Sequence, residues 1–406
     1  MTRALLVCPE PLGHGQPAGI GIRFLEIAKA LLADGHAVSL LSRDAGGVEG
    51  CVCAAITPNT LAQYSDQADV AIVQGHAAND FFAHARPIPT VVDLYDPFII
   101  ENMHYHASRG GEVFTHDHAT LINSLARGDL FLCASEAQRF FYIGLLLAVG
   151  RVNPVAFASD ANFESLLQIA PFGVQPARPL AKRDTESPAI LFGGIYDWYD
   201  PILAIQAVTR LRTVRPGATL TFNTHPNPDL TPQSATGRAV RYVDRQSAEF
   251  VHFVPWVAYG NRGAFFDEFA LALLTFPRSV ETALAMRTRV YDYLWGGIPI
   301  VTSSAPGTDE IVLRYGAGIV VRSEQPDDYA DALIGLLDPA SYDTAAAGTA
   351  DFVAEHQWPR TLAPLLDFVR APKFYPHKQL FATERNVLPA QGSVVEKIMR
   401  RFGVRS

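Results

Sequence analysis

Two carboxylates and two guanidinium groups occur within one strongly apolar stretch of the chain, residues 276–306. They are Glu281, Arg287, Arg289 and Asp292. Charged side chains are costly to bury without a partner, so these four groups predict a ligand. An anionic ligand group would suit the arginines and the start of a helix, where unpaired N–H groups and the helix dipole favour negative charge.

The same stretch has the pattern of a strand, a helix and a second strand. An apolar run, Leu271 to Phe276, precedes helix-period sequence, and a Gly pair separates that sequence from the β-branched run Ile298 to Thr302. If one helix begins near Glu281, eleven positions of roughly 100° each bring Asp292 to within about 20° of the same direction, roughly 16 Å along the axis. This spacing predicts one stripe along which an extended ligand lies.

The composition is that of a globular protein large enough for two domains. The 406 residues are 49% hydrophobic and 18% charged. A net charge of −8 argues against a nucleic-acid binder, which usually carries a basic face. The charge is uneven, because residues 371–406 carry seven Lys or Arg against two Glu. This basic tail is expected to meet a different partner from the acidic body.

Cysteine usage and the chain start indicate a cytoplasmic protein. Cys8, Cys51, Cys53 and Cys133 lack paired C-x-x-C spacing, which favours reduced thiols over a disulfide or metal site. The chain opens directly on a strand, without the pattern of a signal peptide, and no apolar run approaches about 18 residues. Peripheral contact with the inner face of a membrane is a further expectation. This expectation depends on an apolar stripe in the tail, which lies beside basic residues and could rest on an acidic membrane. The alternative is that the stripe packs back on the body of the protein. The stripe comprises Val394, Val395, Ile398, Met399 and Phe402.

The first segments of the chain predict a doubly wound α/β unit. A strand, Ala4 to Cys8, is followed by a Gly-rich segment, a helix from Phe24 to Ala33 and a strand from Ala37 to Leu41. The glycines at 13, 15, 19 and 21 do not fit the G-x-G-x-x-G dinucleotide pattern. What remains is a loop before a helix N-terminus, in which Arg23 could contact phosphate, or an ordinary long loop.

Polar residues follow the strand Thr90 to Asp93, at the sheet edge where open α/β proteins bind ligands. Asp93, Asp96, His104 and His106 are therefore site candidates, although Asp96 before a proline also suits a turn. The H-Y-H spacing would point the two imidazoles apart on a helix, so a metal pair is not expected.

The alternation of strands and helices restarts after a Pro-rich, charged segment, residues 176–188, which has the composition of a linker. We expect two Rossmann-like domains, at 1–175 and 189–370, facing each other across a cleft, with 371–406 as a basic tail. The second domain is expected to carry strands at Ala218 to Phe222, Val251 to Val254 and Gly318 to Val321.

The sequence resembles GT-B glycosyltransferases, and specifically glycosyltransferase family 4, over nearly all of its first 370 residues. The resemblance depends on several motifs together: G-I-G-I-R-F-L-E-I-A-K-A-L-L-A-D-G-H, F-L-C-A-S-E-A-Q-R, G-R-V-N-P, P-F-G-V, F-G-G-I-Y-D-W-Y-D-P, N-T-H-P-N-P and R-T-R-V-Y-D-Y-L-W-G-G-I-P-I-V. It implies transfer of a sugar from a nucleotide diphosphate sugar to an acceptor hydroxyl, with retention. The acceptor would be a glycan, a lipid-linked sugar or a small molecule.

The resemblance also assigns roles to residues. Asp292 stands where the family's second Glu binds the ribose, and Glu281 is assigned to the sugar although ten residues separate the two acids instead of seven. Arg289 matches a basic position of the family, and Trp256 to Tyr259 resemble the loop that meets the nucleobase. The resulting donor-binding set is Gly19, Gly21, Arg23, Gly194, Trp256, Val257, Thr282, Arg287 and Asp292. The catalytic set is Asp93, Glu281 and Arg289, Asp96 and His104 lie on the acceptor side, and no cofactor or metal is implied.

The chain departs from the family pattern at two places. The Arg and Lys that commonly follow the first strand of the second domain are missing after Gly193 and Gly194, so the cation must come from Arg287, Arg289 or Arg23. Asp93 replaces a common His. A sugar-nucleotide epimerase, a pseudo-glycosyltransferase or a non-catalytic partner subunit of the same fold therefore stay as alternatives.

Overall fold

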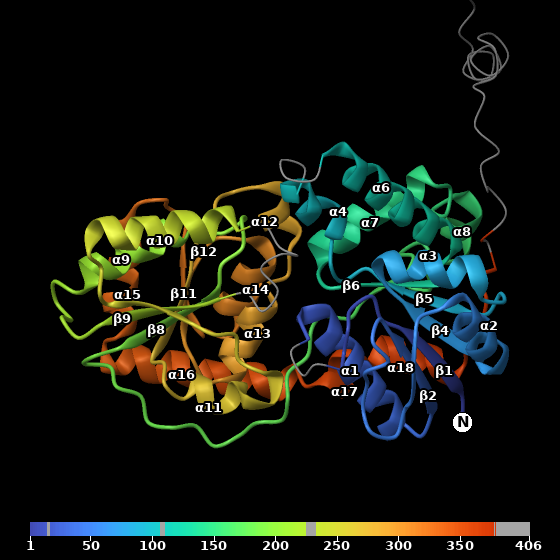
Figure 1. Ribbon diagram of the computed structural model, residues 1–406, viewed down its shortest axis with the longest axis horizontal. Helices are drawn as coiled ribbons and strands as arrows, with labels where there is room; N and C mark the ends of the chain where they lie inside the picture. Colours follow the sequence, from blue (N-terminus) through green and yellow to red (C-terminus); the bar gives the residue numbers. More distant parts are fainter. Residues whose placement is uncertain (14–16, 106–109, 225–232, 377, 379–406) are drawn as a thin grey trace, which may run out of the picture.

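The computed structural model describes residues 1–13, 17–105, 110–224, 233–376 and 378, which form two α/β units side by side (Figure 1). Each unit has a sheet whose strand pairs are all parallel. The sheet orders are β3-β2-β1-β4-β5-β6-β7 and β10-β9-β8-β11-β12-β13. In both sheets the strand order reverses beside the first strand of the unit, as in doubly wound folds. The expected pair of Rossmann-like domains is confirmed.

The N-terminal sheet is built from short, mostly buried strands. Its strands are β1 (Arg3–Val7), β2 (Ala37–Ser42), β3 (Val52–Ala55), β4 (Val70–Val73), β5 (Thr90–Asp93), β6 (Leu130–Cys133) and β7 (Leu167–Ile169). Its helices are α1 (Gly19–Ala33), α2 (Pro58–Gln67), α3 (Gly75–His84), α4 (Phe98–Glu101), the 3₁₀ helix η1 (Asn102–Tyr105), α6 (Gly111–Arg127), α7 (Glu136–Ala148) and α8 (Pro154–Ser159). Helix α1 begins five residues before the expected Phe24, so the Gly-rich segment supplies its first turn instead of a loop.

The C-terminal sheet repeats this construction. Its strands are β8 (Ala189–Gly194), β9 (Thr219–Asn223), β10 (Val251–Val254), β11 (Leu271–Leu274), β12 (Ile300–Ser303) and β13 (Gly318–Val321). The helices are α9 (Pro201–Leu211), α10 (Ser234–Gln246), η2 (Tyr259–Asn261), α11 (Arg262–Phe266), α12 (Val280–Leu284), α13 (Thr288–Trp295), α14 (Pro306–Arg314), α15 (Pro326–Leu336), α16 (Pro339–Glu355), α17 (Trp358–Thr361) and α18 (Ala363–Arg370).

The prediction of one helix carrying Glu281 and Asp292 on a single stripe is wrong. Helix α12 ends at Leu284, Ala285 is extended (φ −68°, ψ 134°), and α13 starts only at Thr288. Because the chain turns between the two helices, the Arg287 side chain points back and pairs with Glu281 in α12. The local Glu281–Arg287 ion pair therefore accompanies the interruption of the helical period.

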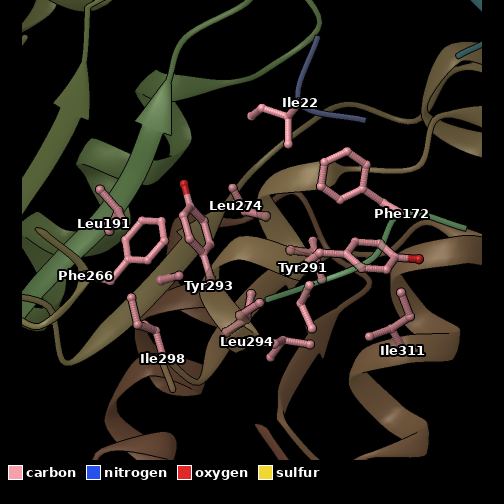
Figure 2. Packing of buried hydrophobic residues seen from close by; sticks show 14 of the residues in the cluster. Ile22, Phe172, Leu191, Phe266, Leu274, Tyr291, Tyr293, Leu294, Ile298 and Ile311 are labelled. Atoms are coloured by element: carbon pink, nitrogen blue, oxygen red, sulfur yellow. The ribbon is translucent and has the colours of Figure 1, made fainter. Parts of the chain in front are cut away.

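Helix α13 is positioned by apolar packing (Figure 2). Leu294 and Ile298 are fully buried beside the sheet, and Tyr291 lies against Phe172 from the end of the N-terminal unit, with ring centroids 6.0 Å apart. The helix thus packs on its own sheet and also touches the domain junction. This placement fixes the polar residues on its other side.

The end of the chain returns to the N-terminal unit. Helix α17 packs on α1, and Arg370 at the end of α18 forms an ion pair with Asp34 at 2.6 Å. Residues 358–370, which the predicted boundary assigned to the second domain, therefore lie against the first (Figure 1). The tail continues there, since Lys378 Nζ lies 3.0 Å from Asp129. The apolar stripe predicted near residues 394–402 falls outside the described residues.

The predicted linker, residues 176–188, is attached to the C-terminal unit at several points. Arg178 forms a bidentate pair with Asp267, with both N–O distances 3.0 Å, and Arg183 donates to the Gly296 carbonyl at 2.8 Å. Among the described residues, no helix combines the length and apolar character that spanning a bilayer would require.

Candidate active site

A cavity of about 450 Å³ lies between the two units, at the carboxyl ends of both sheets. Glu10 and Asp96 line it from segments that follow β1 and β5, and Gly194 and Trp256 line it from segments at the ends of β8 and β10. This is the sheet edge at which doubly wound folds bind ligands. Of the fourteen predicted site residues that the structure describes, eight line the cavity: Gly19, Asp96, Gly194, Trp256, Val257, Arg287, Arg289 and Asp292.

Two helices of opposite units point their N-termini into this cavity. Helix α1 starts at Gly19 and α13 at Thr288, and neither N-cap residue, Ala18 or Arg287, makes a side-chain capping bond. A Cβ on Gly19 would come 2.9 Å from the Tyr95 hydroxyl and 3.5 Å from a Thr288 side-chain carbon, so only glycine allows this approach. Helix N-termini attract anions through their N–H groups and dipoles, so the cavity has a place for phosphate.

Glu10 is a site residue that the sequence analysis missed. Its Oε2 accepts hydrogen bonds from the backbone N–H of Gly21 at 2.9 Å and of Ala18 at 3.2 Å. Burial raises the pKa of this carboxyl to about 7. Glu10 therefore lies where an anion would bind at the start of α1, and its charge depends on pH near neutrality. An isolated Glu between two prolines gave no signal in the sequence.

Arg289 is the predicted cation that reaches the end of β8. Its Nη1 donates to the Gly194 carbonyl at 2.7 Å and to the Phe192 carbonyl at 3.1 Å. Its guanidinium lies 4.3 Å from the centroid of the Tyr199 ring and 5.6 Å from that of Tyr196. A residue from α13 thus places positive charge beside Gly193 and Gly194, where the expected Arg and Lys are missing.

Asp292 is the predicted ribose carboxylate, and it is held by a cation that the sequence analysis missed. Arg262 Nη1 lies 2.6 Å from Asp292 Oδ2, and the Arg262 guanidinium lies 5.7 Å from the Trp256 ring and 5.3 Å from the Tyr259 ring. Burial raises the pKa of Asp292, and the charges of Arg262 and Arg289 oppose this shift. The pair joins the carboxylate to the aromatic loop predicted for the nucleobase.

Glu281 and Thr282 do not line the cavity. Glu281 is 3% exposed and makes two 2.6 Å bonds with Arg287, while Thr282 Oγ1 donates to the Pro277 carbonyl at 2.8 Å. This geometry contradicts direct sugar contact by Glu281 in the described conformation. Arg287 reaches the cavity wall, but its two terminal nitrogens bind Glu281, so its role is to hold the turn between α12 and α13.

Arg23 and Asp93 pair with each other, away from the cavity. Both side chains are 0% exposed, with Arg23 Nε 2.5 Å from Asp93 Oδ2. Arg23 also donates to the carbonyls of Ala170 at 2.8 Å and Pro171 at 3.0 Å. The predicted phosphate contact and the predicted base are therefore corrected: a sealed ion pair joins α1 to β5. Gly21 also lies off the cavity, against Glu10.

Of the two residues predicted for the acceptor side, one lines the cavity and the other does not. Asp96 lines the cavity and hydrogen-bonds to Glu101; burial raises the pKa of Asp96 to about 7 and that of Glu101 well above its ordinary value. His104 is exposed and does not line the cavity, but its ring lies 5.7 Å from that of Trp198 across the cleft. His106 lies outside the described residues.

The described residues contain no cluster of three or more His, Cys, Asp or Glu that could hold a metal ion. The four cysteines are free, and burial raises the pKa of Cys8 and Cys133. We assign no chemistry in the cavity to these thiols.

Several solved structures of similar architecture are glycosyltransferases, although no protein-family model and no curated sequence matches the chain. WaaG, a glycosyltransferase involved in lipopolysaccharide biosynthesis, aligns at 13% identity over 91% of this chain and 100% of its own, with a TM-score of 0.61. Anabaena HepE in complex with UDP and glucose aligns at 13% identity over 92% and 100%, with a TM-score of 0.64. AviGT4, involved in avilamycin A biosynthesis, aligns at 16% identity over 91% and 97%, with a TM-score of 0.56. The chain therefore has the GT-B fold.

Proposed function

We propose that this protein is a glycosyltransferase that moves a sugar from a nucleoside diphosphate sugar to an acceptor hydroxyl. The observation that carries the proposal is the cavity between the two units, where two helix N-termini, Arg289 and the Arg262–Asp292 pair converge. These groups suit a diphosphate and a ribose within one ligand. The similar fold of HepE, whose structure contains UDP and glucose, supports the same ligand class.

In this proposal each part of the donor meets a different wall. The ribose hydroxyls donate to Asp292, which Arg262 orients at 2.6 Å, and the base lies against the loop at Trp256 and Val257. The diphosphate lies between the N-terminus of α1 at Gly19 and the guanidinium of Arg289. The donor is the only small molecule besides the acceptor, and protein groups rather than a metal stabilise the diphosphate.

The reaction breaks the bond between the anomeric carbon and the diphosphate oxygen and forms a bond from that carbon to the acceptor oxygen. The diphosphate leaves with the bonding electron pair, and the acceptor hydroxyl passes its proton to an oxygen of the leaving diphosphate. Positive charge placed where negative charge develops lowers the barrier, which is the role we assign to Arg289 and the two helix N-termini. Asp96, on the opposite wall, orients the acceptor hydroxyl. Retention at the anomeric carbon is part of the proposal through the family resemblance.

Three predicted residues receive a structural role. Arg23 and Asp93 hold α1 against β5, and Glu281 holds Arg287, so each positions a cavity-lining segment without touching the substrate. Gln138 connects the two units in a similar way. Its buried Nε2 donates to the carbonyl of Tyr95 in the N-terminal unit and to that of Leu284 in the C-terminal unit, each at 2.9 Å. The site therefore depends on how the two units meet.

A cytoplasmic location and peripheral membrane contact through the basic tail belong to the proposal as well. Co-sedimentation of the full chain with vesicles containing anionic lipid, compared with vesicles of neutral lipid, would test the contact. Binding to neither kind of vesicle would remove it.

The experiment that tests the function is a product assay over a panel of nucleoside diphosphate sugars with a glycan and glycoside library. We expect release of nucleoside diphosphate from one donor and a glycosylated product with the donor's anomeric configuration, which NMR would identify. Conversion of the donor sugar to an epimer without transfer would indicate the epimerase alternative. Absence of any chemical change, with a second transferase found bound, would indicate the non-catalytic alternative.

A further inference from the structure

A second cavity, of about 460 Å³, opens in the N-terminal unit beside the cleft. Its walls come from the start of α3, from η1 and from the first turns of α6. It shares Asn102 and Tyr105 with the main cavity, so the two spaces adjoin. The function proposed above gives this second cavity no role.

One wall of the cavity is a fixed hydrogen-bond network. Asp117 is 2% exposed, and its two oxygens lie 2.9 Å from His76 Nε2 and 2.9 Å from Asn102 Nδ2. The other nitrogen of His76 lies 3.3 Å from Thr120 Oγ1, which accepts from Asn79 Nδ2 at 2.6 Å. Burial lowers the pKa of His76, and Asp117 opposes this shift. A neutral imidazole with its proton on Nε2 donates to Asp117 and accepts from the Thr120 hydroxyl. These hydrogen bonds connect the side chains of this wall to one another before any ligand enters.

The other surfaces of the cavity are flat rings and acidic or neutral polar groups. His116 stacks on His76 with ring centroids 4.6 Å apart and an interplanar angle of 5°, and its own ring is exposed. Tyr105, Glu112 and Val113 complete the described surface, and none of the described lining residues is Lys or Arg. Such a surface can bind hydroxyl groups and pack against the carbon face of a ring. The full charges among its described lining residues are the carboxylates of Glu112 and Asp117, which disfavour an anion.

We propose that this cavity binds a second ring of the acceptor, so that the acceptor is a polyhydroxylated molecule of at least two rings without phosphate or carboxylate groups. The inference rests on the function proposed above, which places the reacting hydroxyl near Asp96. From Asp96 the chain runs through α4 to Asn102 and Tyr105, the residues common to both cavities. An acceptor longer than one ring thus extends from Asp96 past these two residues into the second cavity.

The test fills the cavity without touching the donor site. Val113→Trp places a large ring in the cavity, and Ala119→Trp, on another face of the same helix and outside the lining, is the matched control. Wild type and both variants would receive UDP-glucose and other nucleotide sugars with a library of mono- and oligosaccharides in neutral, amino-bearing, phosphorylated and carboxylated forms. Transfer is read by mass spectrometry, donor hydrolysis by released nucleotide, and direct library binding by saturation-transfer NMR.

We expect products from neutral or amino-bearing acceptors of two or more rings. Val113→Trp should raise their KM at least tenfold while donor hydrolysis and UDP binding stay at the wild-type level, and Ala119→Trp should match wild type. Products from single rings or acidic acceptors only, or an unchanged KM in Val113→Trp, would overturn the inference. So would the absence of binding by any multi-ring member in the NMR experiment, whereas failure of every nucleoside diphosphate to bind and of every donor to be hydrolysed would count against the proposed function instead.

Discussion

Two Arg–Asp pairs of this protein have the same chemistry and opposite surroundings. The side chains of Arg23 and Asp93 are 0% exposed in the N-terminal unit. Those of Arg262 and Asp292, in the C-terminal unit, are 11% and 18% exposed and line the cleft between the units. Arg23 also binds two backbone carbonyls, and Arg262 instead lies beside two aromatic rings of the nucleobase loop. The first pair joins elements of the fold and the second faces a ligand. Residue type alone does not distinguish these roles.

The largest effect should follow from breaking the fully buried Arg23–Asp93 pair. Asp93→Asn leaves the Arg23 charge buried, and removing one partner of a buried ion pair typically costs about 3–5 kcal/mol. We expect the free energy of unfolding, measured by urea denaturation, to fall by about this amount. The double variant Arg23→Met/Asp93→Leu should recover part of the loss, because it leaves no buried charge. A loss of donor binding at unchanged stability would mean that this pair contacts the substrate.

Replacement of Arg289, a cation that lines the cavity, should affect the reaction more than the stability of the fold. Arg289→Ala takes away positive charge at the diphosphate, and loss of one such group commonly slows catalysis by about 10²–10³-fold. We expect a decrease of this size in kcat for transfer. The exposed Arg278, four residues from β11 and outside the cavity lining, provides the control Arg278→Ala. Equal rates in the two variants would exclude Arg289 from the reaction.

A smaller effect is expected at the ribose carboxylate. Asp292→Asn keeps the shape but weakens the charged hydrogen bonds, each worth about 1.5–3 kcal/mol, so the nucleotide Kd should rise by about tenfold or more. Titration calorimetry with the preferred nucleoside diphosphate would measure the change. Asp331→Asn, at an exposed position of α15, should leave the Kd unchanged. If both variants bind like wild type, Asp292 is a structural acid like Asp93.

The smallest expected effect concerns pH. The folded-state pKa of Glu10 and of Asp96 is raised to about 7, so the folded protein binds more protons than the unfolded chain between about pH 4 and 7. Stability therefore falls as pH rises through this window. Above pH 7 the ionised Glu10 also repels the diphosphate at the start of α1. Nucleotide binding should weaken a few-fold from pH 6 to pH 8.5, and less in Glu10→Gln. An identical pH dependence in this variant would assign the effect to other carboxylates.

The fold was largely predictable because its strands are short apolar runs bounded by turns. The bounds of β5, β10 and β13 match the expected segments, and β3 was missed because Val52-Cys-Ala-Ala at the sheet edge is half exposed. On the C-terminal wall of the cleft, the predicted residues Gly194, Trp256, Val257, Arg287, Arg289 and Asp292 line the cavity, and their roles there stay predictions.

The errors concern long-range partners. Nothing near Arg23 in the sequence indicates a carboxylate 70 residues away, and the partner of Asp292, Arg262, lies 30 residues before it. The break between α12 and α13 depends on the Glu281–Arg287 pair and on Gln138 of the other unit, which binds the last carbonyl of α12. Helical periodicity cannot contain this information, because it describes one segment in isolation.

The central claim is that the cleft between the two units binds a nucleoside diphosphate. Calorimetric titration of the wild-type protein with UDP, ADP, GDP, CDP and dTDP tests it directly, with Arg289→Ala and Arg278→Ala titrated in parallel. We predict that at least one nucleotide binds with 1:1 stoichiometry, more weakly to Arg289→Ala and equally to Arg278→Ala. Absence of binding to all five, with the protein folded, would contradict the claim.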